Sequence, residues 1–301
     1  MNHPLDPDAL LRPWLPSPLE EAHDDRFARR GVRLLLKRDD LIHPDLPGNK
    51  WRKLAPNLRA AAGRTVLTFG GAYSNHLRAT AAAGRLLGFR TIGVVRGDEL
   101  ADRPLNPSLA RCAADGMTLR FVDRATYRAK ADPEVLAGLC HAFVPGSGEC
   151  HVVPEGGSNA PAVRGCTELG RELHGRADVV AVACGTGGTL AGLAAGLAPG
   201  QRALGVPVLR GKFLGDAVRE LQREAFGGPS GSWSLEERFH FGGYARTPPE
   251  LHAFADDFER RHGLRVERLY VAKLLFALTA LAEEGVFPAG ATVAAVITGR
   301  P

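Results

Sequence analysis

The sequence predicts an α/β protein built on two mainly parallel sheets, each flanked by helices. From about residue 65 onward, short apolar runs recur at intervals that suit successive strands. These runs lack the polar alternation of half-exposed strands, and segments with helical periodicity separate them. Continuous apolar strands are typical of parallel sheets that are covered on both faces, and the helices that connect the strands supply this cover.

The first group of elements lies between residues 65 and 154. We expect strands at residues 65–69, 91–95, 117–122 and 150–154. We expect helices at residues 79–87 and 107–114. This order of strands and helices predicts the first sheet.

The second group begins after residue 160 and predicts the second sheet. Its expected strands are residues 178–183, 202–209 and 292–297. Its expected helices are residues 161–173, 189–197, 214–226, 249–262 and 271–284. The first 48 residues are rich in proline and charge, and we expect only residues 32–37 to form a strand there. Residues 228–232 predict a surface loop.

Composition indicates an ordinary globular protein. The 301 residues are 45% hydrophobic and 24% charged, which allows one large core or two modest ones. The formal charge of +5 suits an anionic ligand, and without basic runs interleaved with aromatics we expect no nucleic-acid partner. No signal peptide or stretch of about 20 apolar residues is evident, so we expect no membrane association.

Five cysteines are scattered along the chain, an odd number that favours reduced thiols and a cytoplasmic location. Two of them precede histidines, in Cys140-His141 and Cys150-His151. This spacing fits no common zinc pattern, so we expect free thiols and no metal.

Lys50 is the first candidate for covalent chemistry. It lies in Gly48-Asn49-Lys50-Trp51-Arg52-Lys53-Leu54, which enters a helix after a Pro-Gly turn. A lysine close to other cations is pushed toward its neutral, nucleophilic form, and we expect Arg52 and Lys53 to supply these cations. The alternative is that the three basic residues form a solvated helix face.

A second motif, Gly70-Gly71-Ala72-Tyr73-Ser74-Asn75-His76, follows the strand expected at residues 65–69. Open α/β sheets bind ligands where strands end and helices begin. Ser74 and Asn75 offer a hydroxyl and an amide at this position. The alternative is that Ser74 only caps the helix.

A glycine-rich loop follows the strand expected at residues 178–183. It contains Gly185, Thr186, Gly187, Gly188 and Thr189. Glycines leave backbone N–H groups free to converge, and the N-terminus of the following helix favours an anion. The loop therefore predicts a phosphate site, although it matches neither the Walker motif nor the dinucleotide fingerprint. A plain tight turn is the alternative.

Two tyrosines and a threonine near the C-terminus are further candidates. Tyr270 precedes an expected helix, Tyr244 lies in a loop after Gly242-Gly243, and Thr298 follows the last expected strand. From its position before an expected helix, we predict that Tyr270 is a half-buried aromatic residue of the core. For Tyr244, the sequence leaves open whether the side chain belongs to the core or to a site.

Taken in this order, the motifs resemble the D-cysteine desulfhydrase / 1-aminocyclopropane-1-carboxylate deaminase family. The resemblance runs from Leu35-Leu36-Lys37-Arg38-Asp39-Asp40-Leu41 to Thr298-Gly299 and includes Pro154-Glu155-Gly156-Gly157-Ser158-Asn159. It implies the two-domain fold type II of pyridoxal 5′-phosphate (PLP) enzymes, similar to the β subunit of tryptophan synthase. Residues 1–50 with 155–301 would form the large cofactor-binding domain and residues 51–154 the small one, with the active site in the cleft between them.

The resemblance also implies roles for single residues. Lys50 would carry PLP covalently and move the proton at the substrate Cα. Asn75 would hydrogen-bond the cofactor's phenolic oxygen, and Ser74 would contact the substrate carboxylate or assist proton transfer. Tyr244 and Tyr270 would line the substrate side, and Thr298 would face the pyridine nitrogen. The phosphate would be held by Gly185, Thr186, Gly187, Gly188 and Thr189.

The implied activity is α,β-elimination on a small amino acid, giving a 2-oxo acid and ammonia. Cyclopropane-opening members have a glutamate after the tyrosine and a leucine before the final glycine pair, where Val271 and Thr298 stand here. Desulfhydrases have threonine at both positions. These positions favour D-cysteine or a related D-amino acid as the substrate. The resemblance also implies a homodimer. The alternatives are 1-aminocyclopropane-1-carboxylate deamination, β-replacement, and non-catalytic binding of a phosphorylated ligand.

Overall fold

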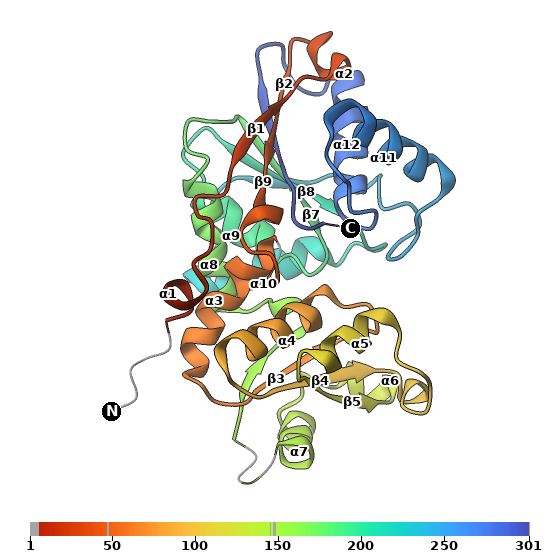
Figure 1. Ribbon diagram of the computed structural model, residues 1–301. Coiled ribbons are helices and arrows are strands. Elements are labelled where there is room, and N and C mark those ends of the chain that lie inside the picture. The colour runs from red at the N-terminus through yellow and green to blue at the C-terminus, as the bar shows by residue number, and fades with distance from the viewer. Residues whose placement is uncertain (1–5, 47, 145, 147–148, 301) are drawn as a thin grey trace. The chain divides into compact units, whose positions relative to one another are not determined.

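The computed structural model describes residues 6–46, 48–144, 146 and 149–300. The chain forms two compact units, each described by itself below (Figure 1). The smaller unit comprises Met1–Arg12 with Leu54–Asn159, and the larger comprises Pro13–Lys53 with Ala160–Pro301. The boundary between Lys53 and Leu54 falls within helix α3 (Asn49–Ala61). The domain limits predicted from the sequence remain a prediction.

A six-stranded sheet, in the order β1-β2-β10-β7-β8-β9, forms the centre of the larger unit. Its strands are β1 (Leu19–Ala22), β2 (Arg33–Lys37), β7 (Val179–Cys184), β8 (Arg202–Pro207), β9 (Trp233–Leu235) and β10 (Thr292–Val296). All neighbouring strands run parallel except β1 and β2, which pair antiparallel with Leu19 opposite Lys37. The parallel strands therefore end at one edge of the sheet.

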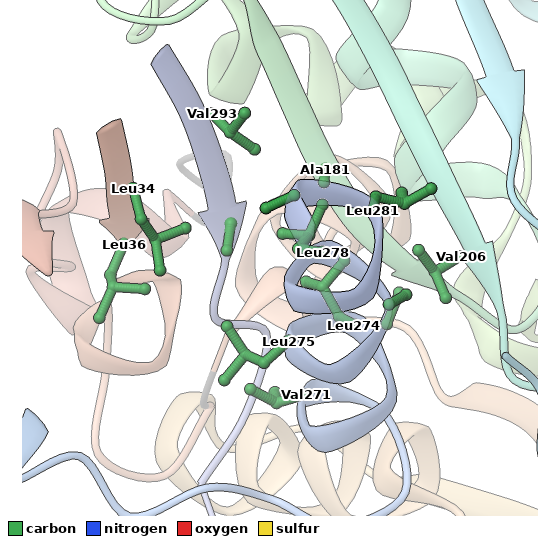
Figure 2. Packing of buried hydrophobic residues seen from close by; sticks show 14 of the residues in the cluster. Leu34, Leu36, Ala181, Val206, Val271, Leu274, Leu275, Leu278, Leu281 and Val293 are labelled. Carbon is green, nitrogen blue, oxygen red and sulfur yellow. The ribbon is translucent and has the colours of Figure 1, made fainter. Parts of the chain in front are cut away.

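Helices cover both faces of this sheet. Side chains of β7 alternate between the two layers: Val179 and Ala181 join one apolar cluster, and Val180 and Val182 join the other. The first cluster includes α2 (Asp25–Ala28), α11 (Pro249–His262) and α12 (Val271–Glu283). The second includes α8 (Ala160–Arg171), α9 (Gly188–Gly196) and α10 (Leu214–Phe226). Figure 2 shows one face of α12 directed at the side chains of β2, β7, β8 and β10 that belong to the first cluster.

The smaller unit contains a four-stranded, fully parallel sheet in the order β5-β4-β3-β6. Its strands are β3 (Val66–Gly70), β4 (Thr91–Arg96), β5 (Thr118–Val122) and β6 (His151–Val153). On one face, α4 (Asn75–Leu87) and α5 (Pro107–Ala114) contribute to an apolar cluster. A second cluster includes α6 (Arg124–Arg128) and α7 (Pro133–Phe143). The smaller unit also contains the short helix α1 (Pro7–Leu11) and the 3-10 turns Asp98–Leu100 and Glu155–Gly157, and a further 3-10 turn, Asp39–Leu41, belongs to the larger unit.

The structure confirms the predicted α/β class, and its helix ends follow local signals. Helix α4 begins after Ser74, which caps it, and ends at Gly88 in the left-handed region. Helix α5 has Asn106 as its cap and Pro107 in its first turn, where a missing N–H costs nothing. None of the helices in the part of the chain that is described has the length and apolar character needed to cross a membrane.

One expectation for the N-terminal region was wrong, because residues 32–37 are not its only strand. β1 lies beside β2 at the sheet edge, and its glutamates Glu20 and Glu21 are exposed. An edge strand needs no continuous apolar run, so the charged sequence hid it. The loop predicted at residues 228–232 lies between α10 and β9, as expected.

Candidate functional site

The candidate residues of the larger unit gather at the carboxyl ends of its parallel strands. The glycine-rich loop follows β7, and Thr298 follows β10, the neighbouring strand in the sheet. The chain that leaves β2, on the other side of β10, leads to Lys50. This edge is where open α/β sheets bind ligands.

The two residues before Lys50 fix its position. Gly48 has a left-handed φ of +68°, and a Cβ built on it would collide with the carbonyl oxygen of Thr298. Asn49 Nδ2 donates a hydrogen bond to Thr189 Oγ1 at 2.8 Å. Lys50 therefore begins helix α3 from a segment tied both to the end of β10 and to the start of α9.

Lys50 is half-buried, and its Nζ donates to Asn49 Oδ1 at 3.1 Å. Burial lowers the pKa of Lys50 to about 8, although Cys166 and Glu267 partly oppose this shift. Desolvation of the amine, and not the charge of Arg52, is the largest cause of this shift.

The two basic neighbours of Lys50 have other surroundings. Arg52 is buried and paired, with Nε 2.8 Å from Asp39 Oδ2 and Nη1 2.8 Å from Glu172 Oε1. Its charge is therefore neutralised within the core of the larger unit. Lys53 is also buried, and desolvation together with the charge of Lys50 lowers its pKa to about 7. None of the three side chains belongs to a fully exposed face, so the solvated-face alternative is excluded.

The glycine-rich loop turns tightly into the start of α9, where side chains larger than glycine would meet close neighbours. Gly187 has φ +84°, and a Cβ on it would lie 2.8 Å from Val218 Cγ2. A Cβ on Gly185 would lie 3.3 Å from the Tyr270 hydroxyl. Among the described residues no side chain caps α9, so its first N–H groups are available to an anion. Thr186 is exposed at the turn of the loop.

The two candidate tyrosines contact each other beside this loop. Their rings pack edge to face, with centroids 6.2 Å apart and planes at 69°. Tyr270 is partly buried against the first apolar cluster, which includes α11 and α12, and Tyr244 is 40% exposed. Tyr270 is thus half-buried, as predicted, and it also borders the glycine-rich loop at Gly185.

Ser74 and Asn75 belong to the smaller unit, at the carboxyl end of β3. Ser74 Oγ accepts the N–H of Leu77 at 3.3 Å and so caps α4, while Asn75 is exposed in the first turn of this helix. A Cβ on Gly70 would lie 2.6 Å from Ser74 Oγ, so only glycine permits this close turn. The helix-capping interpretation of Ser74 is confirmed, and its role toward a substrate remains a prediction.

Three features of the site escaped sequence reasoning. Asn49 was quoted within the lysine motif but was given no role. Glu267 accepts the N–H groups of Leu269 at 2.8 Å and Tyr270 at 2.7 Å just before α12, and that of Val271 at 3.2 Å in its first turn; its place just before an apolar helix was the available signal. Lys273, the single basic residue within α12, was also overlooked.

Within the described residues, no group of three or more His, Cys, Asp or Glu side chains could hold a metal ion. The five cysteines are free thiols. Cys140 and Cys150, each followed by a histidine, place their sulfur atoms 3.3 Å apart. Burial raises the pKa of Cys150 to about 12, so this thiol stays protonated at neutral pH.

Comparison with known proteins identifies similar sequences and a similar fold. The family described as "Pyridoxal-phosphate dependent enzyme" matches residues 11–299. A bifunctional D-cysteine desulfhydrase/1-aminocyclopropane-1-carboxylate deaminase of Arabidopsis thaliana is 32% identical over 55% of this chain and 45% of its own length. A D-cysteine desulfhydrase of Yersinia pestis is 35% identical over 60% of this chain and 58% of its own. The matched part thus spans about half of each relative.

The crystal structure of an ACC (1-aminocyclopropane-1-carboxylate) deaminase homologue superposes on this chain with a TM-score of 0.79 and 27% identity. The superposition covers 99% of this chain and 95% of the other. The predicted fold type II is therefore confirmed, and so is the similarity to D-cysteine desulfhydrases and ACC deaminases.

Proposed function

The chain belongs to the family of pyridoxal-phosphate-dependent enzymes, and we propose that it is a lyase acting on D-cysteine or a related β-substituted D-amino acid. The proposed reaction converts D-cysteine and water into pyruvate, hydrogen sulfide and ammonia. Its main support is the arrangement around Lys50, whose neighbours Gly48 and Asn49 contact Thr298 and Thr189. Lys50, the glycine-rich loop as a site for an anion, and Thr298 with its neutral hydroxyl therefore lie at the same edge of the six-stranded sheet.

The residues of this edge fit PLP. The uncapped start of α9 and the glycines at 185, 187 and 188 suit its phosphate, together with Thr186 and Thr189. Lys50, with a pKa lowered to about 8, suits covalent attachment because a useful fraction is neutral near pH 8. Asn75 would bind the phenolic oxygen and Thr298 would face the ring nitrogen. When bound, the cofactor withdraws electrons from the substrate Cα.

The side chains of the protein then hold the substrate and move its proton. We assign Lys50 to the Cα proton, which it can accept as a neutral amine and later return. We assign Ser74 to the substrate carboxylate, because the hydroxyl stands at the N-terminus of α4, where N–H groups also favour an anion. Tyr244 and Tyr270 would border the side chain of the substrate.

Thr298 favours elimination over transamination. A carboxylate at this position would keep the ring nitrogen protonated and strengthen electron withdrawal. The hydroxyl of Thr298 is neutral, so negative charge at Cα is stabilised less, and loss of a good β leaving group competes better. This argument favours substrates such as cysteine, whose sulfide leaves readily.

The deamination of 1-aminocyclopropane-1-carboxylate is the second candidate, because relatives bear that name. It would convert this substrate and water into 2-oxobutanoate and ammonia. Val271 argues against it, since this side chain is fully buried in the apolar cluster of α12 (Figure 2) and offers no polar group. Arg300, which replaces a family glycine, pairs with Asp40 at 3.5 Å.

A non-catalytic phosphate-binding protein and a β-replacement synthase are weaker candidates. A simple binding protein has no need for a lysine whose amine is kept partly neutral by burial. A β-replacement synthase would need a second substrate, which the proposed elimination does not require. We further propose a cytoplasmic location, supported by the free thiols and the bacterial relative, and a homodimer, which the family resemblance implies. Light scattering on the purified protein tests the dimer.

Spectroscopy and product analysis test the proposed function. The purified protein, supplied with PLP, should show a visible absorption band, and borohydride should fix the cofactor on Lys50 in the peptide map. Lys50→Ala should lose this band and keep the circular dichroism of the parent. Pyruvate and sulfide from D-cysteine support the proposal, whereas 2-oxobutanoate from 1-aminocyclopropane-1-carboxylate supports the second candidate. A bound cofactor with no turnover of any amino acid would contradict both.

A further inference from the structure

Lys273 occupies a position that local preferences oppose. It lies in the first turn of α12 and is fully buried. A cation at a helix N-terminus faces the positive end of the helix dipole, and burial of an ammonium group is costly unless it is well paired. Residues that break local rules in this way usually serve the site that they support.

The ammonium group of Lys273 is directed at backbone carbonyls. Nζ donates to the carbonyl oxygens of Gly243 at 2.9 Å and His240 at 3.0 Å, and it lies 3.5 Å from that of Val208. Each of the three ammonium protons therefore has a carbonyl oxygen as its acceptor. Val208 follows β8 directly, so Lys273 joins α12 both to the end of this strand and to the segment 240–245.

The segment 240–245 has an unfavourable backbone. Phe241, Gly242, Gly243 and Ala245 all have positive φ, of 53°, 87°, 122° and 60°. Two of these residues carry side chains, for which the left-handed region costs free energy. Such conformations persist only where their surroundings enforce them. Lys273 supplies the polar part of this restraint at the carbonyls of His240 and Gly243.

An aromatic contact holds the same segment from α12. The Phe241 ring packs edge to face against Phe276, with centroids 5.0 Å apart. Phe276 and Lys273 are three residues apart, so they lie on neighbouring parts of the helix surface. The segment is therefore attached to α12 at two points, one polar and one apolar.

The restrained segment carries Tyr244. Its ring meets Tyr270, the residue immediately before α12, and Tyr270 in turn borders Gly185. A series of contacts thus runs from Lys273 through the segment 240–245 to both tyrosines and the glycine-rich loop. A change in the backbone at Gly243 would move the neighbouring Tyr244 directly.

We propose that Lys273 is a positioning residue that fixes Tyr244 against Tyr270 and thereby sets the affinity for the substrate side chain. The second half of this statement rests on the proposed function, in which the two tyrosines border the substrate. The first half concerns the protein alone and can be tested without turnover.

Hydrogen exchange tests the first half. In the holoenzyme, Lys273→Met should increase amide exchange of the segment 239–246 at least about tenfold, because the two carbonyl partners lose their donor. Peptides from the smaller unit should exchange as in the parent. Lys212→Met, which removes an exposed lysine, is the matched control and should leave the segment unchanged. Unchanged exchange of residues 239–246 in Lys273→Met would overturn the proposal.

Steady-state kinetics test the second half with D-cysteine and β-chloro-D-alanine. Lys273→Met should raise KM about tenfold while kcat changes less than about threefold, because binding is affected more than chemistry. In a Tyr244→Ala background the same substitution should raise KM less than about threefold, since contacting residues couple in double-mutant cycles. An equal rise in both backgrounds would overturn the role of Tyr244.

A second variant guards against misfolding of Lys273→Met. Gly243→Ala leaves Lys273 in place but disfavours φ +122°, and its Cβ would meet only ordinary contacts, 3.6 Å from Arg210. It should reproduce both the faster exchange and the higher KM, and a parent-like result in both would overturn the proposal. Faster exchange in a protein that turns over no amino acid would support the positioning role and refute the proposed function.

Discussion

Asn49 and Thr189, 140 positions apart in the chain, join their side chains through a buried hydrogen bond of 2.8 Å. The bond links the first turn of the lysine-bearing helix α3 to the first turn of α9, which follows the glycine-rich loop. It therefore sets the spacing between the two parts of the site that we assign to the amine and the phosphate of one cofactor.

Removal of either partner should weaken cofactor binding. Thr189→Val leaves the Asn49 amide buried without this acceptor, at a cost of about 1–3 kcal/mol. We expect the Kd for PLP to rise about tenfold or more, measured by absorption titration of the apoprotein. Asn49→Ala should act similarly, and the double variant should lose less than the sum of the two. Additive losses would show that the pair does not act as a unit.

Gly48→Ala tests the contact with the carbonyl of Thr298. The new Cβ would clash with that backbone, so either the lysine segment or the end of β10 must move. Gly175→Ala is a matched control, because Gly175 also has φ +68° but nothing lies within 4 Å of its Cβ position. The control should cost about 1 kcal/mol in unfolding free energy, and Gly48→Ala should cost more and also shift the visible absorption of the cofactor. Equal effects would contradict the close contact.

The pH dependence of stability should reveal the buried Lys53. Its pKa is lowered from 10.5 to about 7, so the unfolded chain binds more protons than the folded chain between these values. Stability of the apoprotein should therefore rise from this group between pH 7 and about 10.5, while below pH 7 the penalty is constant. Lys53→Met should be more stable than the parent at pH 6 by on the order of a few kcal/mol.

This advantage should shrink as the pH rises toward 10, when measured by urea denaturation. Lys212→Met removes an exposed lysine and should show no comparable trend. An advantage of Lys53→Met that stays constant over the whole range would contradict the burial of a titrating amine.

Glu172 should be essential for the stability of the larger unit. Its carboxylate lies 2.5 Å from Lys37 Nζ and 2.8 Å from Arg52 Nη1, and all three side chains are buried. Glu172→Gln would leave Lys37 with the Ser17 carbonyl and Arg52 with Asp39, and loss of this buried negative charge should cost about 3–5 kcal/mol in chemical denaturation. Glu168→Gln breaks an exposed pair with Arg171 and should cost less than about 1 kcal/mol. Similar losses in both variants would refute this role.

The fold was predictable because its strands carry a strong signal. Residues such as Val179–Cys184 are apolar on both faces, and the predicted parallel sheet followed from that pattern. Edge strands were not predictable in this way, since Leu19–Ala22 contains two exposed glutamates. Helix α7 was missed although Asp132 and Pro133 mark its start, because its apolar pattern is short.

The places of the candidate residues at strand and helix ends were predictable from the sequence, but their electrostatics were not. Sequence motifs located Lys50 and the glycine-rich loop, and the resemblance supplied the cofactor. The sequence suggested that Arg52 would depress the pKa of Lys50. Only the folded structure pairs Arg52 with Asp39 and Glu172, residues 13 and 120 positions away, and leaves desolvation as the cause. The distances that produce such pairings are set by tertiary packing.

Thr298 meets Gly48 through its backbone, because the three atoms nearest to a Cβ on Gly48 would be the carbonyl oxygen, the carbonyl carbon and the Cα of Thr298. The placement of the lysine segment is thus insulated from the identity of the residue at this position. If Thr298 faces the ring nitrogen, as we propose, another side chain at this position would change the chemistry there while the backbone contact with Gly48 stays the same. Separation of geometry from side-chain chemistry gives the fold a route by which new reactions can evolve through single substitutions.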